Sequence, residues 1–181
     1  MLRGISPAPR NAGAKAESAI EMLLGCHERI RHFSGVSTRL AKAEGVAAGE
    51  IVQAAEGLHR YFTIALPLHE ADENNSIQPR LRRAVPEGEL GGPAADAMVE
   101  QHRSIDEIVE RLLPLWQILR SKPEKLPEVS AELRQLSTTL EQMFELHLKL
   151  EEETVFPAME KYLSDGQLDE IVREMRGRRS A

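Results

Sequence analysis

Apolar residues recur at helical spacing along most of the chain, in long stretches separated by short breaks. The stretches cover residues 15–44, 48–72 or a little beyond, 94–120 and 128–156, and a shorter one covers 166–176. The breaks lie at Gly45, at VPEGELGGP (85–93) and at KPEKLP (122–127), where glycine and proline interrupt the pattern. Four amphipathic stretches joined by short connections predict an all-α protein. We expect an antiparallel up-down-up-down four-helix bundle with a short C-terminal helix.

The same pattern divides the chain into three parts. We expect the bundle to occupy residues 15–165 and the short C-terminal helix and tail to occupy 166–181, with the last residues, RGRRSA, frayed. Residues 1–14 contain two prolines, two glycines and no apolar run, which predicts a disordered leader and not a secretion signal. Pro67 lies inside the second stretch, and we expect it to kink that helix or to free a carbonyl near His69.

Composition supports the helical interpretation and narrows the functional classes. Leu, Ala and Glu make up 66 of 181 positions, whereas Val, Ile and Thr together supply 24, which argues against a β-sandwich or barrel. The net charge of −6 disfavours a nucleic-acid or anionic-membrane partner. Cys26 is the single cysteine, which excludes an internal disulfide framework and a cysteine-based zinc cage. No apolar run is long enough for a membrane span, and we expect a cytoplasmic protein of open oligomeric state.

Each of the four long stretches carries one histidine within its apolar stripe. These are His27, His69, His102 and His147. The second and the fourth are followed four residues later by a glutamate, Glu73 and Glu151 respectively. A spacing of four places both side chains of such a pair on one helix face, about 5–6 Å apart, so that both can reach one metal ion or two neighbouring ions.

The histidine-bearing segments also repeat within the chain. HEADENNSIQPRL (69–81) aligns without gaps with HLKLEEETVFPAM (147–159) at a shift of 78, and CHERI (26–30) aligns with QHRSI (101–105) at a shift of 75. The chain therefore resembles two helical hairpins, each contributing one lone histidine and one His-x-x-x-Glu pair. Folding the hairpins together would bring all six side chains to the middle of the bundle.

This set of side chains predicts a metal centre. A single histidine on an apolar stripe is usually a hydrogen-bonded core residue, but four imidazoles and two carboxylates at one level would be costly to desolvate without a cation. Six nitrogen and oxygen ligands exceed what one tetrahedral zinc accepts. Two ions bridged by the two glutamates fit better, with iron as the first choice and manganese or zinc behind it. A bridging oxide or hydroxide, or a further carboxylate, would complete the charge balance.

The ligand pattern resembles the hemerythrin-like, or HHE cation-binding, domain family over about residues 18–162. The matching residues are His27, the pair His69/Glu73, His102, and the pair His147/Glu151 with its trailing EEETVFP. The resemblance implies a four-helix bundle that holds a non-haem di-iron centre. It further implies that Glu73 and Glu151 bridge the two irons and that the four histidines are terminal ligands.

The chain departs from the oxygen-carrying members of that family. Those proteins use a fifth histidine one turn after the third-helix histidine, and Asp106 stands at that position here. Some HHE proteins use a carboxylate directly after the second-helix histidine, which makes Glu70 a seventh candidate ligand, the alternative being a solvated neighbour. Glu152 competes with Glu151 as the bridge, because a five-residue spacing also occurs in the family. Three further residues are expected to lie outside the site: His32, His59 and Glu153.

The leading functional interpretation is a di-iron protein that binds or senses a small diatomic ligand, O₂ or NO. The departure at Asp106 argues against simple oxygen carriage. The second interpretation is a protein of iron-cluster repair or nitrosative stress, and the third is a di-iron oxidase or peroxidase. The sequence contains no glycine-rich phosphate loop and no nucleophile elbow, so it leaves open whether the protein is an enzyme.

Overall fold

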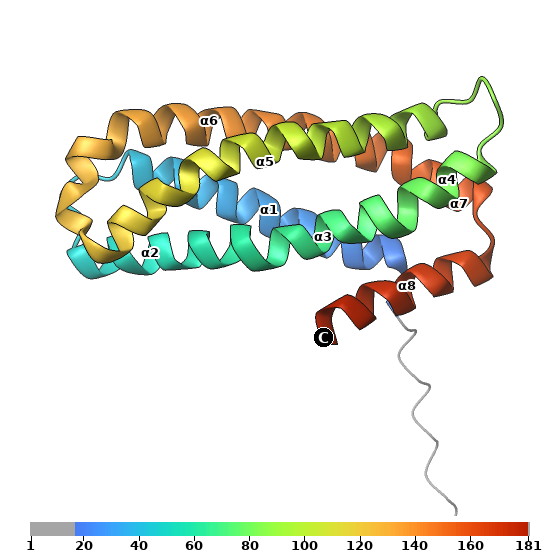
Figure 1. Ribbon diagram of the computed structural model, residues 1–181, viewed down its shortest axis with the longest axis horizontal. Helices are drawn as coiled ribbons and strands as arrows, with labels where there is room; N and C mark the ends of the chain where they lie inside the picture. The colour runs from blue at the N-terminus through green and yellow to red at the C-terminus, as the bar shows by residue number, and fades with distance from the viewer. Residues whose placement is uncertain (1–16, 181) are drawn as a thin grey trace, which may run out of the picture.

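The computed structural model describes residues 17–180 and shows four long helical rods lying side by side (Figure 1). The first rod is α1 (Ala19–Ala41) and the third is α5 (Gly91–Ser121). The second rod runs without interruption through α2 (Ala48–Arg60), η1 (Tyr61–Ala65), α3 (Leu66–Asp72), η2 (Glu73–Ile77) and α4 (Gln78–Ala84). The fourth rod runs through α6 (Leu126–Leu150), η4 (Glu151–Val155) and α7 (Phe156–Tyr162), and a single 3₁₀ turn, η3 (Pro123–Lys125), precedes it.

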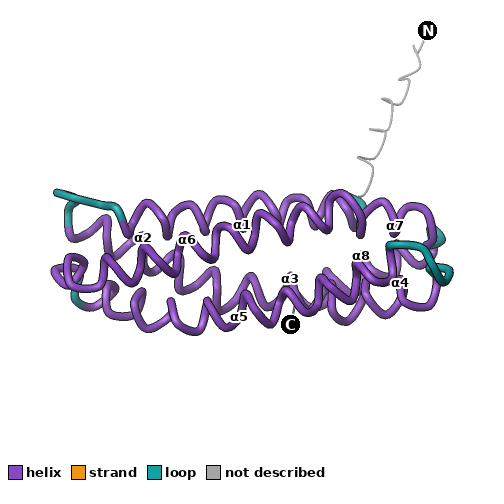
Figure 2. Tube along the Cα trace, turned by 90° about the horizontal axis from the view of Figure 1, so that it is seen from above, coloured by secondary structure: helices purple, strands orange, loops and turns teal. Residues whose placement is uncertain are grey.

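The rods form an antiparallel bundle in which each rod has two neighbours. Rod α1 packs against α2 and α6, and rod α5 packs against the same two from the other side. The last helix, α8 (Asp165–Ser180), lies across α1 and α3 on the outside of the bundle (Figures 1 and 2). This arrangement confirms the predicted all-α up-down-up-down bundle with a C-terminal helix. None of the helices over residues 17–180 is long and apolar enough to cross a membrane. The predicted leader, residues 1–14, lies outside the described residues.

The second and fourth rods are longer than the hydrophobic pattern predicts, because three wide π-helical turns carry them past prolines. These turns are η1, η2 and η4, and each is closed by a backbone hydrogen bond that spans five residues. A proline follows as the second residue of the next α segment in each case: Pro67, Pro79 and Pro157. Proline has no N–H, and its ring collides with the carbonyl four residues earlier in a regular helix. Widening the preceding turn removes that collision, so the helix continues through Pro67.

The internal repeat extends to the backbone. Turn η2 and helix α4 correspond residue by residue to turn η4 and helix α7 at the shift of 78 found in the sequence. Each copy therefore places its glutamate, Glu73 or Glu151, at the first position of a π-helical turn. Single π-helical turns inside α-helices are often found at functional sites.

The apolar core consists of two clusters with a polar layer between them. In α1, Leu23 belongs to one cluster and Ile30 to the other, and the buried His27 lies between them. The other three rods repeat this order, with an equally buried histidine at the boundary between the two clusters. Those histidines are His69, His102 and His147. The bundle therefore holds its buried imidazoles at one level, closed off above and below by apolar side chains.

Helix α8 is held to the bundle by ion pairs with a buried carboxylate. Asp72 has no exposed surface, and its two oxygens pair with Arg178 at 2.8 Å and Arg179 at 2.6 Å. Arg80 of α4 adds a second connection, because it pairs with Glu174 at 2.7 Å. The expectation of a frayed RGRRSA tail is therefore wrong for residues up to Ser180, which remain helical because two of the arginines have a buried partner.

Gly91 at the start of α5 should not tolerate a side chain, whereas its neighbour Gly92 should. A Cβ at Gly91 would lie 2.6 Å from the Cβ of Ala158, whereas a Cβ at Gly92 would meet nothing closer than 3.9 Å. We expect Gly91→Ala to lower the free energy of unfolding by about 1–3 kcal/mol. Gly92→Ala should leave it unchanged or raise it by up to about 1 kcal/mol. Urea unfolding of the two variants checks this, and equal stabilities would contradict the close approach of α5 to α7.

Candidate metal centre

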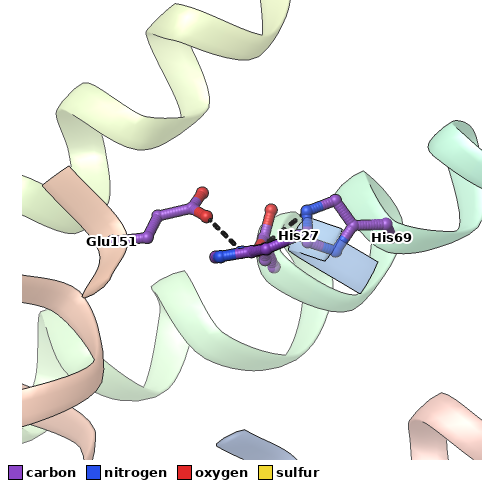
Figure 3. A group of neighbouring side chains, drawn as sticks. His27, His69 and Glu151 are labelled. Carbon is purple, nitrogen blue, oxygen red and sulfur yellow. Dashed lines mark ion pairs between the residues drawn. The ribbon is translucent and has the colours of Figure 1, made fainter. Parts of the chain in front are cut away.

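The polar layer brings together six of the seven candidate ligands. His27 comes from α1, His69 from α3, His102 from α5 and His147 from α6, and Glu73 and Glu151 open the turns η2 and η4. All six side chains belong to residues that are at most 3% exposed. Figure 3 shows three of them, with His27 between the carboxylate of Glu151 and the ring of His69. The four-residue spacing places each glutamate on the same helix face as the histidine that precedes it.

The two carboxylates each reach across to a histidine of another rod. One oxygen of Glu151 lies 2.8 Å from Nε2 of His147, and its other oxygen lies 2.9 Å from Nε2 of His27. Glu73 repeats the arrangement, with one oxygen 3.4 Å from Nε2 of His69 and the other 3.1 Å from Nε2 of His102. Each carboxylate therefore has one oxygen on either side of the centre, as a bridging ligand does.

The six side chains form two overlapping groups that could each hold a metal ion. One group is His27, His69, Glu73 and Glu151, and the other is Glu73, His102, His147 and Glu151. Within each group the ligand atoms lie within 4.8 Å of one another. The glutamates belong to both groups, whereas each histidine belongs to one. Two imidazole nitrogens and two carboxylate oxygens on each side are a donor set suited to iron, manganese or zinc.

The residues fit a cation because many of their polar atoms otherwise have no partner. Both oxygens of Glu73 and of Glu151 lack a hydrogen bond, as do the Nε2 atoms of His27, His69 and His102. The short N···O distances do not satisfy these atoms, because the geometry is wrong for an N–H to donate to the oxygen. Burying so many polar atoms without partners is costly, and a bound cation would coordinate them.

The remaining ring nitrogen of three histidines is fixed by a hydrogen bond. Nδ1 of His27 donates to Glu152 at 2.8 Å; that of His102 donates to Asn74 at 2.9 Å; that of His147 donates to Gln101 at 2.9 Å. With the proton on Nδ1, the lone pair of Nε2 faces the centre, which is the form that binds a metal. Nδ1 of the fourth histidine, His69, has no such acceptor.

The structure gives Glu151 and Glu152 different positions. Glu151 is fully buried in the centre, whereas the side chain of Glu152 is 31% exposed and accepts hydrogen bonds from His27 and Arg31, each at 2.8 Å. Glu152 therefore contacts a candidate ligand from outside the centre and belongs to neither ligand group. The three residues expected to lie outside the site belong to neither group of ligands: His32, His59 and Glu153.

Glu70 lies outside both groups, although it is 7% exposed and one of its oxygens has no hydrogen-bond partner. Burial, with the nearby charges of Asp106 and Glu151, raises the pKa of Glu70 to about 8. Burial and Glu110 also raise the pKa of Asp106, the residue at the position of the fifth histidine. The carboxyl group of Asp106 is thus close enough to raise the pKa of Glu70, and position 106 supplies no fifth imidazole.

Burial determines the protonation of the metal-free centre. It lowers the pKa of His69 and that of His102 to about 3, so both rings are neutral at neutral pH. Burial and the neighbouring Glu151 raise the pKa of Glu73 well above its usual value. Burial acts on Glu151 in the same direction, but His147 and His27 outweigh it and hold the pKa of Glu151 below its usual range. The rings of His69 and His102 are therefore ready to bind a metal, whereas Glu73 must first release a proton.

Comparison with known families agrees with this geometry. A family model described as the hemerythrin HHE cation-binding domain matches residues 18–121 and 94–179. The chain belongs to the hemerythrin HHE cation-binding domain family. The two matches overlap on α5 and together cover all four rods of this HHE domain and most of α8. No curated protein matches the chain.

The sequence pattern did not identify Asn74 and Gln101 as functional residues, although each is next to a candidate ligand in the chain. Asn74 directly follows Glu73, and Gln101 directly precedes His102. We expect Asn74→Ala to weaken metal binding by about 10–100-fold, because the ring of His102 loses the acceptor that orients it. The exposed neighbour Asn75 is the matched control, and Asn75→Ala should bind metal like the wild type. Equal affinities of the two variants, measured by competition with a chelator, would show that this hydrogen bond does not orient the ligand.

Proposed function

We propose that this HHE domain binds two iron ions between Glu73 and Glu151 and uses them to bind or sense O₂ or NO. The observation that supports this most directly is the sharing of both carboxylates by the two ligand groups. A single-ion site would need only one group, and the second pair of imidazoles would then be buried without a partner. The internal repeat also supports two ions, because each hairpin supplies one histidine and one His-x-x-x-Glu pair.

The residues around the proposed centre suit a small apolar ligand. Bound iron would supply the reversible electron transfer on which the binding of O₂ or NO depends. Each side offers two imidazoles and two carboxylate oxygens, which leaves coordination positions open at an ion that takes five or six ligands. The apolar clusters on either side of the polar layer exclude water, and Phe156 stacks on the ring of His27 with a centroid distance of 5.2 Å. Exclusion of water slows the loss of protons and side reactions at such a centre.

Metal analysis and absorbance spectroscopy test this function together. After anaerobic loading with Fe(II), we expect about two irons per chain, as the two overlapping ligand groups require. Exposure to O₂ or NO should produce a new near-ultraviolet absorbance that reverses when the gas is removed. One zinc per chain, with no optical response to either gas, would disprove the proposal. Rapid consumption of peroxide by the iron-loaded protein would instead favour an oxidase or peroxidase.

A further inference from the structure

A cavity of about 220 Å³ lies against His69, on the outer side of the candidate centre. It opens between α1, the second rod and the end of α8. Its lining includes Cys26, Arg29, Tyr61, Ala65, His69 and Arg179. His69 is the only one of these residues that belongs to a candidate metal group of the described chain. The cavity therefore reaches a candidate ligand from behind, without entering the space between the two carboxylates.

His69 presents an unpartnered nitrogen on this outer side. The residue is 1% exposed, and neither of its ring nitrogens has a hydrogen-bond partner. Nε2 is the nitrogen near Glu73, at 3.4 Å, and Nδ1 is separated from it by one ring carbon. Figure 3 shows the two nitrogens of the His69 ring pointing in different directions. A metal on Nε2 fixes the proton on Nδ1 and leaves a buried N–H that needs an acceptor.

The walls of the cavity carry an excess of positive charge. Nη2 of Arg29 lies 3.1 Å from Sγ of Cys26, and Nη2 of Arg179 lies 3.9 Å from the same sulfur, so two guanidinium groups meet there. Asp72 is the carboxylate partner of Arg179, but it is shared with Arg178. One carboxylate thus serves two guanidinium groups, and among residues 17–180 the hydrogen-bond partner of Arg29 is the thiol of Cys26. Guanidinium groups bind oxyanions through paired N–H donors.

We propose that this cavity binds a small inorganic oxyanion, which accepts a hydrogen bond from Nδ1 of His69 and pairs with Arg29. Such an anion would do for His69 what Glu152, Asn74 and Gln101 do for the other three histidines. It goes beyond the proposed function, because the anion lies behind a candidate ligand and not at the iron. An acceptor at Nδ1 makes the imidazole a stronger metal ligand, so the oxyanion also strengthens metal binding.

Phosphate titration of the zinc-loaded protein tests the proposal, because zinc is diamagnetic and leaves the imidazole signals sharp. The probe is inorganic phosphate, with chloride at equal ionic strength as the reference. We expect phosphate, and not chloride, to shift the ¹⁵N signal of Nδ1 of His69 with saturation. Equal small shifts with both anions would show that water alone occupies the cavity. A shift confined to the other three histidines would show phosphate binding at the metal, and either result would overturn the proposal.

Two variants locate the bound anion. Arg29→Gln should weaken phosphate binding by at least about tenfold, because one charged hydrogen-bond donor is lost. Arg82→Gln removes a positive charge from α4, outside the cavity, and should change binding by less than about twofold. Ala65→Val would narrow the cavity without changing its charge and should also weaken binding. Equal phosphate affinity in the wild type and Arg29→Gln would disprove the site.

Metal content separates this result from the proposed function. Arg29 is exposed and belongs to neither ligand group, so in phosphate-free buffer with saturating metal its variant should keep the metal content of the wild type. If Arg29→Gln loses phosphate binding but keeps its metal content, the result supports the anion site, whichever metal the centre holds. An anion site on a protein that binds no iron would leave the oxyanion proposal intact and disprove only the di-iron function.

Discussion

Replacing Glu73 with leucine should stabilise the metal-free protein and abolish most of the stabilisation that metal provides. The carboxyl of Glu73 is fully buried and neither of its oxygens has a hydrogen-bond partner. Removing an unpartnered buried polar group should raise the free energy of unfolding of the metal-free protein by about 1–3 kcal/mol. With metal present the variant should instead have a lower free energy of unfolding than the wild type, because both ligand groups contain Glu73 and both lose a donor. A site filled at a thousand times its dissociation constant contributes about 4 kcal/mol, and Glu73→Leu forfeits that contribution.

Urea unfolding with and without Fe(II) measures both effects in one experiment. Glu153→Leu is the matched control, because Glu153 is exposed, belongs to neither ligand group and follows Glu151 by two residues. It should leave the increment from metal unchanged. If Glu73→Leu destabilised the metal-free and metal-loaded proteins equally, the carboxyl would be a structural group and the metal would lie elsewhere.

The bundle could be predicted from the sequence because its buried stripes follow a constant helical period. The three π-helical turns could not, because a wide turn adds a residue and shifts the stripe that follows it. The second stripe was predicted to end at residue 72 or a little beyond, whereas its rod continues through turn η2 to Ala84. Pro79 and Pro157 could have been read as signals for these turns, since they occupy equivalent positions in the repeat.

The choice between Glu151 and Glu152 could not be made from the sequence. A spacing of four residues returns to the face of His147 in a regular helix, whereas a spacing of five returns to it only in a wider turn, and the chain widens into a π-helical turn at this point. The outcome depends on α1, a distant element, because His27 and Arg31 bind Glu152 from there. The six buried candidate ligands, by contrast, were predictable because each lies at the centre of an apolar stripe, where an unpartnered polar side chain is costly.

The end of the chain was misjudged for a similar reason. The last six residues, RGRRSA, consist of three arginines, a glycine, a serine and an alanine, which is the composition of a frayed tail. Their partner Asp72 lies about a hundred residues earlier, and by itself it resembles a charge on the solvated side of a helix. Only the packing of α8 against α3 makes it a buried carboxylate that needs a cation. Local sequence patterns do not contain such a long-range pairing.

Acidification should leave the stability of the metal-free protein nearly unchanged between about pH 6.5 and pH 4.5 and lower it steeply below about pH 4.5. The pKa values of His69 and His102 are about 3 in the folded protein against 6.5 in the unfolded chain. Because these values are lowered by folding, the unfolded chain binds more protons at these two groups below pH 6.5, which lowers stability as the pH falls. Glu73 and Glu70 act in the opposite direction: their raised pKa values let the folded protein hold two protons that the unfolded chain has released.

The two pH ranges differ in the number of protons involved. Above pH 4.5 the protons on Glu73 and Glu70 offset the two histidine protons, so the stability changes little with pH. Below pH 4.5 both glutamates are protonated in both states and their offset disappears. The lowered pKa of Glu151 then adds a third proton that only the unfolded chain binds, so His69, His102 and Glu151 together give a slope of about 4 kcal/mol per pH unit.

Urea midpoints measured between pH 7 and pH 3 would show this change of slope, and the Glu73→Leu variant gives the sharper test. Without the offset from Glu73, its stability should already fall by about 1.4 kcal/mol per pH unit below about pH 6.5, because the proton on Glu70 offsets only one of the two histidine protons. His32→Gln, which removes an exposed imidazole outside the centre, should behave like the wild type. A stability of Glu73→Leu that stays level or rises between pH 6.5 and pH 4.5 would mean that at least one of the two imidazoles accepts a proton freely in the folded bundle. Burial would then not keep both rings neutral in the metal-free protein.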